Sequence, residues 1–136
     1  MLIFLYGFAN FAPAAIRLML GAAFIAHGYP KLKNRAGVTQ WFDSIGIKPA
    51  PFWWFVVFVT EFFGGIALVL GAFVQIVAVL LMINMLVAMW KVKWGKVGFS
   101  AQGGWELDAA YFVMALALLL SGAGAYSVDM WRLFGW

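Results

Sequence analysis

The sequence of 136 residues contains no cysteine, one histidine and only five acidic residues. The lack of cysteine excludes disulfide exchange and thiolate–metal chemistry. Charged residues make up 10% of the chain against 66% for hydrophobic residues, which excludes an ordinary soluble domain. The apolar runs are continuous and do not alternate with polar residues, as the strands of an outer-membrane barrel would. The composition therefore predicts membrane-spanning helices, whose backbone groups satisfy one another within the lipid.

The apolar residues gather into stretches close to the about 20 residues that one helical crossing needs. The run 52–90 is about twice that length, so we expect Gly71 and Ala72 to break it into a hairpin. Pro30 is expected to end the first span, and residues 37–44 to form a short interfacial helix. The chain is thus predicted to be an all-α integral membrane four-helix bundle, a single domain over residues 1–136. Its expected spans are residues 13–29, 52–71, 73–90 and 105–122.

The positive charges predict how this bundle lies in its membrane. Seven of the nine Lys and Arg residues fall in the loops between spans one and two and between spans three and four, whereas the opposite side has only Arg132. Because cytoplasmic loops carry the excess of Lys and Arg, we expect both loops in the cytoplasm and both termini outside, in the cytoplasmic (inner) membrane. The charge is used for orientation, so no nucleic acid is expected as a partner. Residues 1–10 lack the basic region and cleavage site of a signal peptide, and none is expected.

Glu61 is the central candidate residue, because it places an ionisable group in the middle of the second expected span. Such a group costs about 2.5–3.5 kcal/mol on insertion scales, so by default it marks a functional site or a buried pair. Arg17 in the first span lies within about 6 Å of the same expected depth. We therefore predict an ion pair between Arg17 and Glu61, which either fixes the helix register or serves a catalytic or ligand-binding site.

Further polar groups complete the candidate site. His27 lies on the same helical stripe as Arg17, as a catalytic proton carrier or as a packing residue. Asn84 is either a ligand contact or a hydrogen-bonding link between helices. Glu106 and Asp108 begin the fourth span, where acids complement the helix dipole; they lie about 200° apart, so both cannot face the core equally. No metal site is expected, and a haem would find only His27 as a histidine ligand.

The sequence resembles the DoxX family of small bacterial and archaeal membrane proteins. The resemblance is carried by RLMLGAAFIAHGYPKL at 17–32, GVTQWFDSIGI at 37–47, EFFGGIALVLG at 61–71 and the segment 103–129. It covers nearly the whole chain and implies a four-helix membrane bundle. It also implies an association with membrane oxidoreductase systems, since the relative DoxD is a subunit of an archaeal thiosulfate:quinone oxidoreductase. Without cysteine, a redox role here requires a bound cofactor.

Three functional hypotheses follow. In the first, the chain is a membrane subunit of a quinone-linked oxidoreductase system, and a quinone binds near Arg17, His27, Glu61 and Asn84. His27 then hydrogen-bonds a quinone carbonyl or passes a proton, Glu61 accepts a proton, and a partner supplies the electrons. In the second, the chain is a non-catalytic structural or assembly subunit of a larger membrane complex. The third, a carrier of small solutes or protons, lacks the repeats and broken helices typical of transporters. Expected partners are membrane lipids and larger membrane subunits or further copies of the chain.

Overall fold

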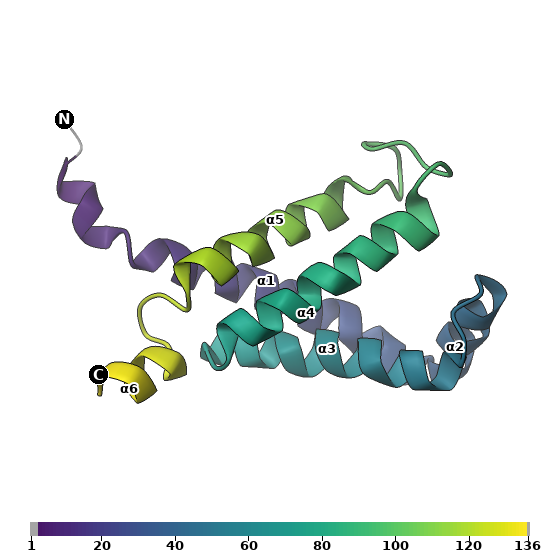
Figure 1. Ribbon diagram of the computed structural model, residues 1–136, viewed down its shortest axis with the longest axis horizontal. Helices are drawn as coiled ribbons and strands as arrows, with labels where there is room; N and C mark the ends of the chain where they lie inside the picture. Colours follow the sequence, from purple (N-terminus) through teal and green to yellow (C-terminus); the bar gives the residue numbers. More distant parts are fainter. Residues whose placement is uncertain (1–2, 136) are drawn as a thin grey trace.

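The computed structural model describes residues 3–135, and every regular element in this part of the chain is a helix (Figure 1). The all-helical prediction is confirmed, while residues 1, 2 and 136 of the expected domain lie outside the described part. η1 is a 3₁₀-helix and η2 a π-helix. The elements are η1 (Ile3–Phe8), α1 (Phe11–Lys33), α2 (Arg35–Ser44), α3 (Ala50–Leu70), α4 (Val74–Val87), η2 (Ala88–Lys93), α5 (Glu106–Ser121) and α6 (Val128–Phe134).

Three helical stretches are long and apolar enough to cross a membrane: Phe11–Lys33, Ala50–Leu70 and Val74–Lys93, the last formed by α4 and η2. They correspond to the first three expected spans. α5 has 16 residues, so at 1.5 Å per residue it is about 24 Å long against a hydrocarbon core of about 30 Å. The fourth crossing therefore stays a prediction.

The first span does not end at Pro30, and this expectation is wrong. α1 continues through Pro30 to Lys33. Proline lacks the N–H that would bond the carbonyl of Ala26 four residues earlier, so α1 loses one hydrogen bond there and still continues. The carbonyl of Pro30 still accepts from the backbone N–H of Asn34 at 2.9 Å. The additional turn carries Lys31, which becomes important below.

The hairpin at Gly71 is confirmed. Gly71 ends α3 in the left-handed conformation, with φ of 71°. Its N–H donates to the carbonyl of Leu68, and the N–H of Ala72 donates to the carbonyl of Ala67, which is the hydrogen-bond pattern of a Schellman cap. α4 begins three residues later, where both carboxylate oxygens of Asp129 accept the backbone N–H groups of Phe73 and Val74. The first N–H groups of a helix have no carbonyl one turn earlier to bond, and a carboxylate at this position accepts from them.

Glycines allow α1 and α3 to pack backbone against backbone. An ideal Cβ added to Gly65 would lie 2.8 Å from the carbonyl oxygen of Gly21, and one added to Gly28 would lie 2.8 Å from the backbone nitrogen of Phe62. Small residues at helix interfaces in membranes serve this purpose. The glycine contacts therefore fix the antiparallel register of α1 against α3.

Replacement of Gly65 by alanine is expected to destabilise the protein by about 1–3 kcal/mol, because the new methyl group meets backbone atoms that cannot move independently. Gly64→Ala is the matched control, since a Cβ there would meet only the side chain of Val77, at 3.2 Å. The free energy of unfolding, measured by titration with sodium dodecyl sulfate in mixed micelles, distinguishes the two. Equal stability of both variants would contradict the close contact.

α1 packs chiefly on α3, and α4 on α5. The buried core between the two helix pairs includes Leu20 and Phe24 of α1, Leu68 of α3, Leu81 of α4 and Leu118 of α5. In Figure 1, η1 and α6 lie at one end of the bundle with the turn between α3 and α4, and we call this the terminal end. α2 and the loop after η2 lie at the other, which we call the cavity end.

The short helix expected over residues 37–44 is present as α2 and begins two residues earlier, at Arg35. Its buried residue Phe42 belongs to a second small core with Ala50, Trp54 and Phe58 of α3. α2 is therefore attached to the start of α3 by apolar packing. Its location at a membrane interface stays a prediction.

Candidate functional site

A cavity of about 330 Å³ lies at the cavity end, between side chains of α1, α2, α3, α4, η2 and α5. We call it the polar cavity, because six polar side chains from α1, α3, α4, η2 and α5 line it. Its aromatic lining consists of Phe24, Trp41, Phe42 and Tyr111. Its polar lining consists of His27, Lys31, Glu61, Asn84, Lys93 and Asp108.

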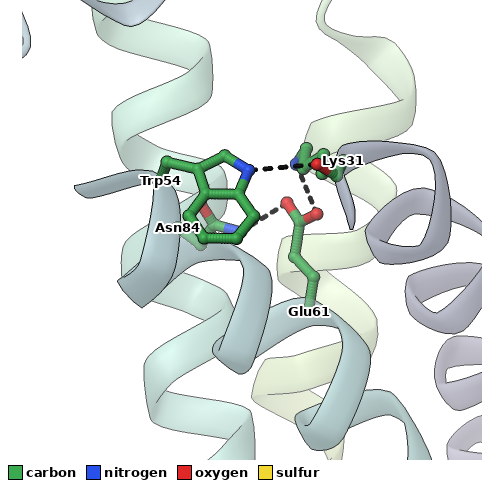
Figure 2. A network of polar contacts seen from close by, with 4 residues as sticks. All are labelled: Lys31, Trp54, Glu61 and Asn84. Atoms are coloured by element: carbon green, nitrogen blue, oxygen red, sulfur yellow. Dashed lines mark hydrogen bonds and ion pairs between the residues drawn. The ribbon is translucent and has the colours of Figure 1, made fainter. Parts of the chain in front are cut away.

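Glu61 is buried, with 4% of its surface exposed, and has two partners (Figure 2). One carboxylate oxygen, Oε2, forms an ion pair and hydrogen bond with Nζ of Lys31. The other, Oε1, accepts a hydrogen bond of 2.9 Å from the amide of Asn84. The carboxylate of α3 is thereby connected to α1 on one side and to α4 on the other. A buried carboxylate is tolerated when it is paired and hydrogen-bonded in this way.

Trp54 positions the end of α1 that carries Lys31. Its indole Nε1 donates to the backbone carbonyl of Lys31 at 3.0 Å (Figure 2). The indole ring is stacked on Phe58, and the guanidinium of Arg35 lies 4.7 Å from its centre. The last turn of α1 is therefore held against α3, which keeps the Lys31 ammonium beside Glu61.

A second pair of opposite charges lines the same cavity. Nζ of Lys93 forms an ion pair with Oδ2 of Asp108 and donates to the carbonyl of Gly104 at 3.1 Å. Oδ2 of Asp108 is buried and has no partner with hydrogen-bond geometry among the described residues, so charge alone holds this contact. Lys93 ends the π-helix η2, where Trp94 N donates to the carbonyl of Met89 five residues earlier. Such π-turns occur frequently at functional sites.

His27 lies at the rim of the polar cavity, between α1 and α5. Its ring centre is 5.8 Å from that of Tyr111 in an edge-on arrangement and 6.2 Å from that of Phe24. The residue itself is exposed, and no hydrogen bond of its ring is found within residues 3–135. His27 thus borders both the cavity and the surroundings of the bundle.

Arg17 does not pair with Glu61, and the expected ion pair is incorrect. The register set by the glycines places Gly28 against Phe62, so Glu61 lies level with the last turns of α1. Arg17 lies about three turns earlier, at the terminal end. There its guanidinium donates to five backbone carbonyls, those of Leu68, Val69, Ala123, Ala125 and Tyr126. The final carbonyls of a helix have no N–H partner of their own, which makes the end of α3 a good acceptor for a cation.

The remaining candidates separate into two groups. Asn84 and His27 line the polar cavity with Glu61, as expected for one site. Of the two acids that begin α5, Asp108 reaches the cavity whereas Glu106 is exposed and outside it. Their separation around the helix accounts for this difference.

Sequence reasoning missed Lys31, Lys93 and Tyr111. Both lysines were interpreted as loop charges that set orientation. Lys31 continues the stripe of His27 by one more turn, which is a detectable signal once Pro30 is allowed inside the helix. Lys93 had no such signal, because it ends a π-turn, which changes the direction in which a side chain points. Tyr111 lies in α5, three residues after Asp108 and therefore on the same face of that helix.

The polar cavity combines two ammonium groups, two carboxylates and a neutral amide. Its formal charges cancel, so it suits an uncharged ligand with polar atoms better than an ion. Low-dielectric surroundings strengthen the hydrogen bonds that such a ligand makes. The ammonium and amide groups donate to carbonyl oxygens, and the carboxylates and the imidazole can exchange protons.

Comparison with known proteins agrees with the resemblance seen in the sequence. The family model DoxX matches residues 12–94, which is more than half of the chain and extends from α1 into the loop after η2. A protein of Bacillus subtilis (strain 168) named "Putative oxidoreductase CatD" is 30% identical over 114 residues, covering 84% of this chain and 81% of its own. Among solved structures, none matches significantly. The chain is a membrane protein of the DoxX family.

Proposed function

We propose that the chain is a membrane subunit of a quinone-linked oxidoreductase system and that the polar cavity binds the quinone head group. Family membership and the name of the Bacillus subtilis relative support an oxidoreductase system. The observation that supports a quinone as the ligand is the charge-balanced cavity. In it Lys31 and Asn84 contact Glu61, and aromatic side chains form part of the lining.

The cavity fits such a head group in size and chemistry. Its volume of about 330 Å³ lies within the range of about 300–1,000 Å³ usual for small-molecule sites. A quinone ring is flat and apolar with a carbonyl oxygen at each end. Phe24 and Tyr111 offer aromatic surfaces for the ring, while Lys31 and Asn84 offer N–H donors for an oxygen.

A bound quinone would take up electrons and protons. In the proposal, Nζ of Lys31 and Nδ2 of Asn84 orient one carbonyl oxygen. The carboxylate of Glu61, next to both donors, holds or accepts the proton exchanged there. His27 at the rim moves protons between the cavity and its surroundings. Arg17 has no part in this chemistry, because it is engaged at the terminal end.

The electrons are assigned to a partner. The sequence has no cysteine for a thiol couple, so a larger membrane or membrane-associated subunit supplies them in this proposal. The Lys and Arg residues gathered at the cavity end favour the cytoplasmic side of the inner membrane for that end. The partner would therefore meet the protein on the cytoplasmic face.

The test is equilibrium binding of a short-tailed quinone to the purified protein in lipid nanodiscs, followed by quenching of tryptophan fluorescence. Asn84→Leu is expected to weaken binding about tenfold, as loss of one well-placed hydrogen bond predicts. Gln75→Leu is the matched control: it removes an amide from the other end of the same helix, where Gln75 donates to the carbonyl of Leu119. This control is expected to keep the affinity of the unmodified protein.

A second pair of variants keeps the proposal testable if Asn84→Leu does not fold. Asp108→Asn disturbs the Lys93 pair inside the cavity, whereas Glu106→Gln makes the same chemical change two residues earlier, outside it. We expect weaker binding only for Asp108→Asn. An unmodified protein that binds no quinone would contradict the proposal and favour the assembly role.

A further inference from the structure

A second hollow lies beside the polar cavity, as a groove between α3 and α4. Its volume is about 340 Å³. Several of its lining residues are exposed large apolar side chains, which in a membrane span face lipid. Its walls include Trp53, Val56 and Thr60 of α3 and Leu80, Ile83 and Val87 of α4.

The groove and the polar cavity share part of their lining. Five residues belong to both: Phe42, Ile47, Val57, Asn84 and Val87. Asn84 marks the boundary, because it lines the groove while its amide donates to Oε1 of Glu61 in the cavity at 2.9 Å. A molecule lying across this boundary meets hydrocarbon on one side and paired charges on the other.

We propose that the groove between α3 and α4 holds the hydrocarbon tail of the quinone and is the route by which the ligand enters from the lipid. The inference rests on the proposed function, since the head group must occupy the polar cavity. An alkyl or isoprenoid tail makes van der Waals contacts with the apolar walls of the groove, and its polar head gains hydrogen bonds beyond Asn84. The chemistry of the two connected hollows is therefore that of a single amphiphile.

A phospholipid is the rival occupant. Lys48 and Lys91 also line the groove and could bind its phosphate. With the phosphate on these lysines, however, a phospholipid lies in the groove and leaves the donors of the polar cavity beyond Asn84 unused. The tailed quinone satisfies the polar boundary as well as the apolar walls, which is why we favour it.

The test compares a short-tailed and a long-tailed quinone on the same nanodisc samples. Val56→Phe and Ile83→Phe fill the groove from its two walls. Each is expected to weaken binding of the long-tailed quinone about tenfold, because the added ring fills the space of the tail and removes its packing contacts, and to leave binding of the short-tailed quinone unchanged. Leu86→Phe is the matched control, because it adds a ring at an exposed position of the same helix outside the groove. A long-tailed quinone with a photoreactive group on the tail should label peptides of α3 and α4.

The outcomes separate the two proposals. Unchanged affinity for the long-tailed quinone in both groove variants would overturn the tail site and leave the head-group site standing. Equal weakening of both quinones would also overturn it, since the variants would then act through the cavity. A groove that loses a co-purified phospholipid on mutation, with quinone affinity retained, would assign it to lipid instead. If the unmodified protein binds neither quinone, the proposed function fails and this inference with it.

Discussion

Replacement of Arg17 by methionine is expected to destabilise the protein by at least about 4 kcal/mol, a loss that single substitutions reach only when they remove a buried network. Arg17 is 3% exposed and donates to five carbonyls from the end of α3 and from residues 123–126. Methionine fills a similar space but offers no donor, so the carbonyls of Val69, Ala123, Ala125 and Tyr126 lose their partner, whereas that of Leu68 keeps the N–H of Gly71. Hydrogen bonds to a charged donor contribute about 1.5–3 kcal/mol each and do not add in full.

The measurement is the free energy of unfolding in mixed micelles. Arg132→Met is the control, since Arg132 is exposed and its guanidinium only lies over the ring of Phe73, at 5.4 Å. We expect that control to cost less than about 1 kcal/mol. Arg17→Lys should fall between the two, because an ammonium has fewer donors and no planar fork. Equal losses for Arg17→Met and Arg132→Met would show that the carbonyl contacts do not hold the terminal end together.

Replacement of Lys31 by methionine is expected to cost about 3–5 kcal/mol, the range for removing one partner of a buried ion pair. Glu61 would keep only the neutral amide of Asn84 as a partner. The carboxylate would then be a buried charge without compensation. Unfolding of the variant in mixed micelles measures the loss.

The double variant Lys31→Met, Glu61→Met separates charge from packing. Removing both charges is expected to restore most of the lost stability, since apolar replacement of a whole buried pair is often neutral. Lys33→Met is the control on the same helix: Lys33 is exposed and lies over the ring of Tyr29, at 4.8 Å. A double variant as unstable as the single one would show that the loss does not come from the unpaired charge of Glu61.

Much of the fold was accessible from the sequence because apolar run length and glycine chemistry act locally. Gly71 ends α3 where a left-handed residue was needed to divide an over-long run, and Gly65 faces α1 as its small size predicts. The existence of α2 was also predictable. The end of α1 was not, because a helix can continue past a proline at the loss of one hydrogen bond, and the bond from Trp54 to the carbonyl of Lys31 that holds the additional turn is not visible in the sequence.

The site was predicted in its location and only partly in its connections. Glu61, Asn84 and His27 line one cavity, as their polarity within apolar spans suggested. The partner of Glu61 was assigned wrongly, since the register between α1 and α3 comes from contacts such as Gly28 against Phe62 that a single sequence does not display. Lys93 depends on a π-turn, which local sequence patterns do not reveal.

The two ends of the bundle are held together by different interactions, side chain to backbone at one end and side chain to side chain at the other. At the terminal end, Arg17 and Asp129 hold backbone groups, which cannot rotate away. At the cavity end, the two helix pairs meet through the bond from Asn84 to Glu61 and through Tyr111 against α1. The two helix pairs are therefore held rigidly together at the terminal end and less tightly at the cavity end. Within residues 3–135, a ligand that accepts from the amide of Asn84 would replace the hydrogen bond to Glu61 that is broken when the two helix pairs separate at this end.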